Sequence, residues 1–479
     1  MPEASQVTSA GRASIFLGAG TVVQVVSGFA LAKVLALCTG VEGVGLQGMC
    51  LAIGSLAALA CGLGVGAALV RALGSQGPEV RLRLSTATVT WFRLAGLGAG
   101  ILTLFLILVV GMDGFGLGPL PRAQGVPLCL GITCALLQVG DLAVLTAYRA
   151  SQAIAVSLAV GAIVGAGIGS ALVFQFGYGA ITTAYLTTQA SVSLAAYVMR
   201  RREVGALAFH PAASAKDLRL LIVNGVAIAL STVVGSGVQL VMPLLIQRMS
   251  GLNSVGLFRS VTAITIGGVG IMAVTLARDY YPRVAGSSPQ ELVDLPRQQQ
   301  RLLLTACVPL VIAGTLFAGP ALRLAYSPSF EVASTFFGLQ LVGEVMRLTS
   351  FTYAYVLLAR AGRGTYLALE SAAGALLLVL GVTGLKLFGL NGLGAAYLIT
   401  YTAYLVAAAE LCRRRCAVRP SPGIMCALAI TAASGLLLLG DWPPLTKVAV
   451  VVIATGASAV LLVRSRPNTR QVIFRTGVS

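Results

Sequence analysis

Five ionisable residues lie inside long apolar stretches of the sequence: Lys33, Asp141, Glu344, Arg347 and Glu370. If these stretches cross a bilayer, each charge at its centre costs about 2.5 to 3.5 kcal/mol, so such a residue must face protein or water. Charged groups held at that depth can bind an ionic solute or counter one another. We therefore take these five as the candidate substrate-binding residues.

Each candidate also has a plainer structural interpretation. Glu344 and Arg347 share one helix face at their i, i+3 spacing, so they could simply neutralise each other instead of taking part in transport. Lys33 has a long stem that could carry its ammonium to the membrane interface. Asp141 and Glu370 lie nearer helix ends, where solvation at the interface accounts for them. The sequence leaves these alternatives open.

Catalytic and metal chemistry find little support in the composition. His210 is the single histidine and the carboxylates are not clustered, so no acid–base pair is apparent. The 9 cysteines include no C-x-x-C pair and mostly lie in apolar segments, which indicates packing residues and not zinc ligands or disulfides. We expect no enzymatic activity, no metal and no cofactor.

The elements that carry these residues are membrane-spanning helices. The chain of 479 residues is 57% hydrophobic and 10% charged, far from the average of soluble proteins, and its mean hydropathy is +0.91. Apolar windows of about 20 residues, enough to cross a hydrocarbon core, follow one another with short connections and predict about 14 spanning helices. Among the predicted breaks are 38–42, 177–179, 247–254 and 389–392. The fold class is therefore all-α and polytopic.

Basic residues define the orientation of the predicted helices. The formal charge of +18 is spread over short loops, which is typical of topology signals and not of a nucleic-acid-binding surface. About 25 Lys and Arg fall on one side and about 6 on the other, which places both termini in the cytoplasm. The sparse outer side holds Arg122, Arg248, Arg259, Arg323, Lys386 and Lys447. We expect a multi-pass protein of the cytoplasmic (inner) membrane.

The sequence repeats itself at a separation that is constant to within one position. Thr21-Val22-Val23 recurs as Thr232-Val233-Val234, and the glycine-rich turn 40–46 recurs at 251–257. Near the other end of each half, Phe176-Gly177 matches Phe388-Gly389, and 184–186 matches 396–398. We call this separation the repeat offset. Glycine-rich turns resemble one another in many membrane proteins, but the shared offset favours a duplication.

The duplication predicts the domain organisation. Residues 1–205 and 206–419 would form two parallel six-helix repeats, and 420–479 would add two extra helices and a cytoplasmic tail. Because each half has an even number of helices, both enter the membrane from the same side and their pseudo-twofold axis follows the membrane normal. Two bundles related in this way enclose a cleft that rocking can open to either side.

Two segments carry a resemblance to a known family. Residues 32–46 resemble the first helix and turn of Wzx-type flippases, in the polysaccharide-transport branch of the multidrug/oligosaccharidyl-lipid/polysaccharide (MOP) exporter superfamily. Residues 340–347, with Ala359 and Glu370, are similar to the tenth and eleventh helices of that family, where a Gly-acid pair precedes a basic residue. The resemblance covers roughly the first twelve helices, whereas the extra helix pair varies among members.

The resemblance implies a flippase that moves an undecaprenyl-diphosphate-linked oligosaccharide across the cytoplasmic membrane for surface polysaccharide synthesis. It also implies a lysine at the position of Lys33, membrane lipids around the protein and a polysaccharide polymerase as a further partner. Lys33 and Arg347 could line a cationic cleft for the diphosphate.

Two alternatives remain at this stage. A cation-coupled multidrug exporter of the same superfamily would want acidic residues in the cleft, and both signs are present. A membrane polymerase or ligase of glycan assembly would expose a large outer loop with catalytic basic residues, and every predicted outer loop is short. Neighbouring glycosyltransferase genes would support the flippase, whereas a drug-responsive regulator beside the gene would weaken it.

Overall fold

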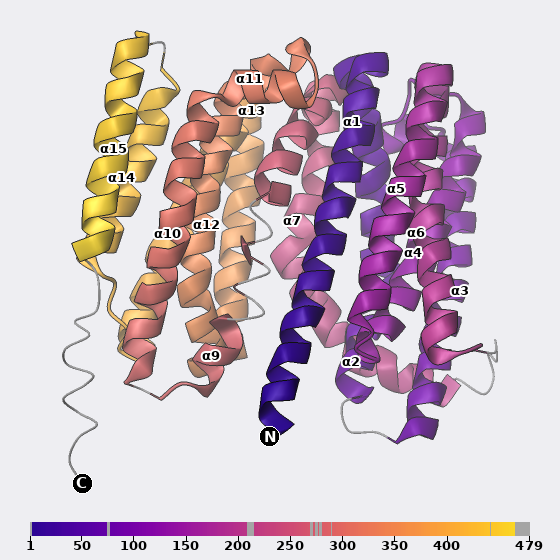
Figure 1. Cartoon of the computed structure of the whole chain (residues 1–479). Helices are drawn as coiled ribbons and strands as arrows, with labels where there is room; N and C mark the ends of the chain where they lie inside the picture. Colours follow the sequence, from indigo (N-terminus) through magenta and orange to yellow (C-terminus); the bar gives the residue numbers. More distant parts are fainter. Residues whose placement is uncertain are drawn as a thin grey trace. The chain divides into compact units, whose positions relative to one another are not determined.

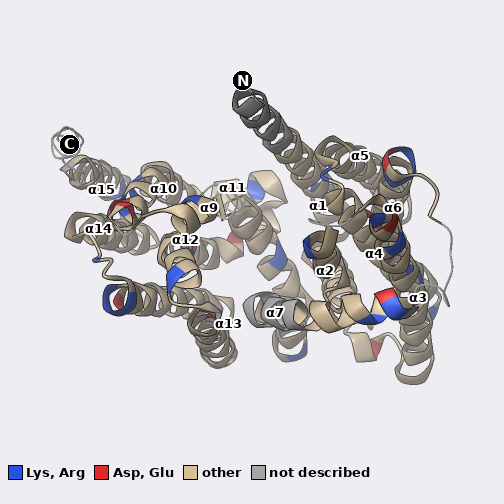
Figure 2. Cartoon of the chain, turned by 90° about the horizontal axis from the view of Figure 1, so that it is seen from below, with Lys and Arg blue, Asp and Glu red and all other residues tan. Residues whose placement is uncertain are grey.

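A computed structural model describes residues 2–73, 77–207, 215–268, 272–273, 276, 280–288, 290–440 and 442–464. Its described residues form helices and connections, without strands, as the all-α prediction requires. In a view along the helices, most of the ribbon belongs to residues other than Lys, Arg, Asp and Glu (Figure 2). The long helices are α1 (Pro2–Gly62), α3 (Pro78–Val110), α4 (Gly125–Ala147), α5 (Ser151–Phe176), α6 (Ile181–Val204), α7 (Ala215–Thr262), α10 (Glu291–Leu316), α12 (Ser334–Arg360), α13 (Arg363–Cys416), α14 (Pro422–Leu438) and α15 (Pro444–Arg464).

Shorter elements connect the long helices (Figure 1). They are α2 (Val65–Ala72), η2 (Asp113–Phe115), η3 (Arg122–Gln124), η4 (Gly177–Ala180), the π-helical turn η5 (Ala263–Gly267), α9 (Tyr281–Gly286), α11 (Ala318–Ala325) and η7 (Pro328–Ala333).

Several segments are far longer than one membrane crossing needs. Among the described residues, 7 helical segments are long and apolar enough to span a membrane, and three of them measure 47, 54 and 53 residues: Phe16–Gly62, Ser151–Val204 and Gly364–Cys416. About 20 residues suffice for one crossing. Each long segment contains a glycine with positive φ, namely Gly40 (φ 65), Gly177 (φ 54) and Gly389 (φ 60). Glycine adopts this conformation without a Cβ penalty, so the helix can break there.

Helix α13 folds back on itself at Gly389. The Tyr404 hydroxyl donates to Glu370 Oε1 at 2.5 Å although the two residues are 34 positions apart, and Arg415 reaches Thr365 Oγ1 at 2.5 Å. A straight helix would separate the first pair by about 51 Å. The two arms of α13 are therefore antiparallel neighbours, and the predicted break at 389–392 is confirmed.

The duplication is visible in the backbone. Gly40 and Gly251, which the repeat offset pairs, have torsion angles (φ, ψ) of (65, −160) and (79, 177). Gly177 and Gly389, paired in the same way, have (54, −127) and (60, −144). Each pair breaks its helix in nearly the same way, as expected if the two halves inherited one backbone plan.

Side-chain packing repeats at the same offset. A Cβ added to Gly131 would lie 2.6 Å from the ring of Tyr185, and one added to Gly343 would lie 2.7 Å from the ring of Tyr397. The repeat offset that maps Tyr185 onto Tyr397 also maps Gly131 onto Gly343. The predicted equivalence of the two tyrosines therefore extends to the glycine that each ring covers.

The chain divides into two compact units. The first contains residues 1–259 with 325–329, and the second contains 260–324 with 330–479. This division reflects packing, whereas the predicted lobes 1–205, 206–419 and 420–479 reflect the sequence repeat and stay a prediction. In the second unit, the extra pair α14 and α15 lies beside α10 and α12 (Figure 1), with Gly435 packed against Val342.

Candidate functional site

The most buried charges of the second unit lie in the middle of α12. This helix is buried along most of its length from Phe336 to Leu357, so its polar residues must be satisfied by protein. Glu344 is 0% exposed and Arg347 is 9% exposed. The predicted pair therefore lies inside the protein, where snorkelling to the interface cannot help either residue.

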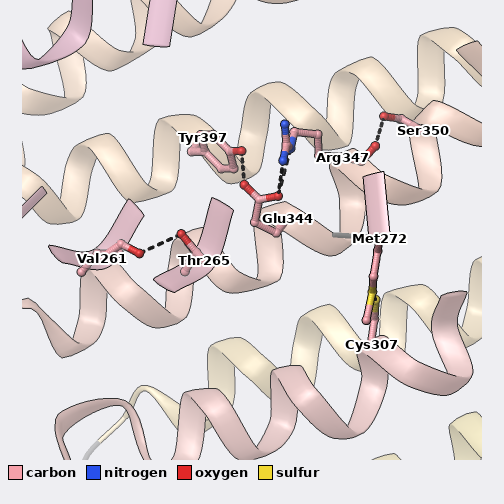
Figure 3. A network of polar contacts seen from close by, with 8 residues as sticks. All are labelled: Val261, Thr265, Met272, Cys307, Glu344, Arg347, Ser350 and Tyr397. Carbon is pink, nitrogen blue, oxygen red and sulfur yellow. Dashed lines mark hydrogen bonds and ion pairs between the residues drawn. The ribbon is translucent and has the colours of Figure 1, made fainter. Parts of the chain in front are cut away.

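The Glu344 carboxylate is bonded on both oxygens. Arg347 Nε and a terminal nitrogen of its guanidinium lie 2.9 and 2.8 Å from Oε2, and the Tyr397 hydroxyl donates to Oε1. Figure 3 shows Tyr397 and Arg347 approaching Glu344 from two sides. Three donors and an opposite charge compensate the desolvation of the carboxylate, so the arrangement supports the ionised pair.

Aromatic rings complete the surroundings of the guanidinium. The Arg347 Cζ atom lies 5.4 Å from the Phe351 ring centroid and 5.9 Å from that of Tyr401, within the range of cation–π attraction. A carboxylate on one side and rings on the other hold Arg347 in one place. Such a group is pre-organised, but its charge is already balanced locally.

A row of tyrosines on α13 links the two carboxylates that the sequence singled out. The rings of Tyr397 and Tyr401 are 4.6 Å apart, and those of Tyr401 and Tyr404 are 6.2 Å apart. Tyr397 bonds Glu344 at one end, and Tyr404 bonds Glu370 at the other. The i, i+4, i+7 spacing of the tyrosines marks one helix face, and this spacing is the sequence signal that indicates the row.

In the first unit, Asp141 of α4 is paired with Arg200 of α6. Arg200 Nε lies 2.6 Å from Asp141 Oδ1, and the two side chains are 1% and 8% exposed. Arg200 also donates to the Gly205 carbonyl oxygen at 3.3 Å, at the end of α6. Arg201 and Arg202 beside it are exposed, whereas packing of α6 on α4 encloses Arg200.

The two halves differ in charge although they share a backbone plan. At the repeat offset, Tyr353 and Cys412 replace Asp141 and Arg200, and the Cys412 thiol lies 3.3 Å from the Tyr353 carbonyl oxygen. Conversely, Ile132 stands where the second half has Glu344. Each half thus has its own buried ion pair, and the two pairs occupy positions that do not correspond in the repeat.

Within the first unit, the two glycine-rich turns contact each other. A Cβ on Gly45 would lie 2.3 Å from the Leu252 carbonyl oxygen, and one on Gly256 would lie 2.0 Å from that of Val41. The repeat offset pairs Val41 with Leu252 and Gly45 with Gly256, so the contacts are reciprocal, as across a twofold axis. Only small residues allow helix backbones this close. We call this contact the glycine seam.

Arg259 lies at the same axis. The distribution of Lys and Arg predicts an outer-side position for Arg259. The structure places it in α7, about two turns after Gly251, where the helix breaks. A Cβ on Gly48 would lie 2.6 Å from Arg259 Cγ, and position 48 is the repeat counterpart of 259. The space at the axis therefore holds one side chain. The second half supplies that side chain with Arg259, and the first half leaves room for it with Gly48.

Lys33 lies in α1, about two turns before Gly40, and is half-buried. It belongs to the first unit together with Asp141, whereas Glu344, Arg347 and Glu370 belong to the second. The structure joins Glu344 to Arg347 directly and joins Glu370 to them through the tyrosine row. Asp141 has acquired a partner of its own in Arg200.

Two solved structures of transporters are similar to the chain in fold. The chain is similar to the lipid II flippase MurJ in its inward closed conformation, with a TM-score of 0.72, 13% identity, and coverage of 94% of this chain and 98% of that chain. It is also similar to the inward-facing conformation of a multidrug resistance MATE family transporter of the MOP superfamily, with a TM-score of 0.67, 15% identity, and coverage of 82% and 94%. The chain therefore shares the fold of these transporters, and that fold is all-α and polytopic, as predicted.

The sequence comparison is more specific. No family model matches the chain. The chain is 24% identical to the lipid III flippase of Escherichia coli (strain K12) and to that of Shigella flexneri, in each case over 414 residues, which is 83% of this chain and 96% of the relative. These matches support the resemblance to Wzx-type flippases. All of these proteins are flippases or transporters, in line with the expectation that the chain is not an enzyme.

Proposed function

We propose that this protein is a flippase that moves a lipid-linked oligosaccharide across the cytoplasmic membrane by alternating access. The observation that carries the proposal is the match to lipid III flippases over 96% of their length. The MOP fold and the recurring glycine breaks support it, because parallel repeats are the architecture of a rocking transporter. The substrate class would be an undecaprenyl-diphosphate-linked oligosaccharide for a surface polysaccharide, with a polymerase as a downstream partner.

The electrostatics of this substrate determine which residue matters most. With a negative cytoplasm, the membrane potential favours outward movement of an anion by about 2.3 kcal/mol per charge for each 100 mV. The remaining barrier is desolvation of the diphosphate, which fixed positive charge lowers. The resemblance to Wzx-type flippases implies a lysine at the position of Lys33, and the proposal therefore assigns the leading cationic role to Lys33.

Lys33→Ala is expected to abolish flipping, and Lys33→Arg to retain part of it. The measurement is accumulation of the lipid-linked glycan on the cytoplasmic face of cells that carry each variant at matched membrane abundance. Lys447→Ala is the control and should flip normally, because Lys447 is a half-buried lysine that the charge distribution predicts on the outer side. Normal flipping by Lys33→Ala would remove Lys33 from the mechanism. If loss of the whole protein causes no accumulation, the flippase proposal fails.

The proposed topology places both termini in the cytoplasm, because the side with the excess of Lys and Arg is the cytoplasmic side. A reporter active only outside the cytoplasm should give signal when fused at Gly118 or Ser329, and none when fused at Gly205 or Ser287. A reversed pattern would overturn the orientation without affecting the fold.

A multidrug exporter is the second candidate, since the fold of a MATE transporter is also similar. The buried geometry weighs against it: Glu344 is paired with Arg347, so it offers no unbalanced negative charge for a cationic drug. Unchanged drug susceptibility in cells that accumulate the lipid-linked glycan would separate the two functions.

A further inference from the structure

The second arm of α13 carries an open apolar groove of about 610 Å³. Leu398, Ile399, Thr402, Ala403, Val406 and Ala407 line it, and Glu410 lies at one end. Ile399 and Val406 are 54% and 64% exposed, so the groove faces outward from the second unit. The small side chains of Ala403 and Ala407 lower its floor between larger neighbours.

A basic cluster closes the same end of the groove. Arg413 donates twice to the Glu410 carboxylate, at 2.7 and 2.6 Å, and Arg414 Nε donates to it at 2.5 Å. The two arginines follow Glu410 by three and four positions and therefore continue the helix face of the groove. With Arg415 beside them, three positive charges face one negative charge, and the cluster keeps a net positive charge.

The length of the groove matches one leaflet. From Leu398 to Glu410 the helix rises about 18 Å, at roughly 1.5 Å per residue. One leaflet supplies about half of a hydrocarbon core that is roughly 30 Å thick. An acyl chain along the groove would therefore end near the bilayer midplane, with its phosphate beside Arg413 and Arg414.

We propose that this groove binds one anionic glycerophospholipid of the cytoplasmic leaflet, with an acyl chain against Ala403 and Ala407 and the phosphate at Arg413 and Arg414. Charge complementarity identifies the occupant, because basic clusters at the cytoplasmic end of a helix attract anionic headgroups. Two other occupants fit less well. A polyprenyl tail is much longer than one leaflet, and a second protein copy would bring no phosphate to Arg413 and Arg414. The proposal does not depend on the flippase function.

The test uses the full chain in nanodiscs that contain phosphatidylglycerol diluted in phosphatidylcholine, with bound lipid counted by native mass spectrometry. The double change Arg413→Gln with Arg414→Gln should weaken phosphatidylglycerol binding by about 30-fold, the effect of two basic residues near a charged surface. Ala403→Leu with Ala407→Leu should displace the same single lipid by filling the groove. Melting in lipid-free detergent should be unchanged in both.

The controls are matched in type. Arg201→Gln with Arg202→Gln alters an exposed arginine pair at the end of α6, and Gly167→Leu adds bulk to an exposed site of α5 with open space around it. Both should retain the lipid. The proposal is overturned if the α6 pair loses as much lipid as the α13 pair, or if groove filling changes nothing. It is also overturned if filling dissociates a dimer instead, or if a polyprenyl diphosphate competes for the lipid one for one.

Discussion

Arg347→Ala is expected to destabilise the protein by about 3 to 5 kcal/mol, the usual result of leaving one charge of a buried pair without its partner. Glu344 is 0% exposed, so water cannot replace the guanidinium. The Tyr397 hydroxyl would remain as a donor to the carboxylate. The double change Glu344→Gln with Arg347→Gln should be milder than Arg347→Ala, because it removes both charges and keeps polar groups able to bond each other.

The measurement is the melting midpoint of each purified variant in one detergent, together with its flipping rate at matched abundance. Arg297→Ala is the matched control: Arg297 and Asp294 have the same i, i+3 spacing but are 34% and 44% exposed, and a pair of this kind contributes about 0 to 1 kcal/mol. Equal defects in Arg347→Ala and the double variant would show that the pairing does not govern stability. A stable Arg347→Ala that cannot flip would instead assign Arg347 to the substrate.

Gly45→Ala and Gly256→Ala are expected to impair flipping to the same degree. Each new methyl would meet a carbonyl oxygen, at 2.3 and 2.0 Å, so the two helices of the glycine seam must part. Overpacking of this kind costs about 1 to 3 kcal/mol, which corresponds to a shift of roughly 5- to 150-fold in an equilibrium. The equality follows from the reciprocal contacts, since each methyl opens the same seam from the opposite side.

Two measurements test this expectation: the flipping rate, and the labelling of a cysteine at Ala52 in a background without other cysteines. Ala52 continues the seam face of α1 and is 2% exposed, so a membrane-impermeant reagent should reach it faster when the seam opens. Gly98→Ala in α3 is the control, because nothing lies within 4 Å of its new methyl. Strong impairment by one seam variant and none by the other would contradict the reciprocal arrangement.

Local patterns predicted the helical framework well. The apolar windows are interrupted near Gly40, Gly177, Gly251 and Gly389, and each of these four glycines has a positive φ in the structure, a conformation that glycine adopts without a Cβ penalty. The pairing of Glu344 with Arg347 also followed from spacing on one helix. These features depend on residues within a turn or two of each other.

Partners that depend on distant packing could not be predicted in this way. Tyr397 meets Glu344 across 53 positions, and Arg200 meets Asp141 across 59. Neither separation is a helix period, so only the docking of α13 on α12 and of α6 on α4 brings the groups together. The charge of Arg200 looked like a topology signal because it stands beside Arg201 and Arg202, which are exposed.

The fold-back of α13 has a consequence for how the chain enters the membrane during synthesis. Its two arms can insert as one helical hairpin, so Glu370 reaches the bilayer together with Tyr404, the donor that bonds it. Glu344 likewise arrives with Arg347 close behind it in the same helix. Asp141 differs, since Arg200 follows 59 positions later. At about 5 to 20 residues per second, the ribosome needs roughly 3 to 12 s to deliver that partner, and until then Asp141 must stay near the aqueous end of α4 or carry a proton.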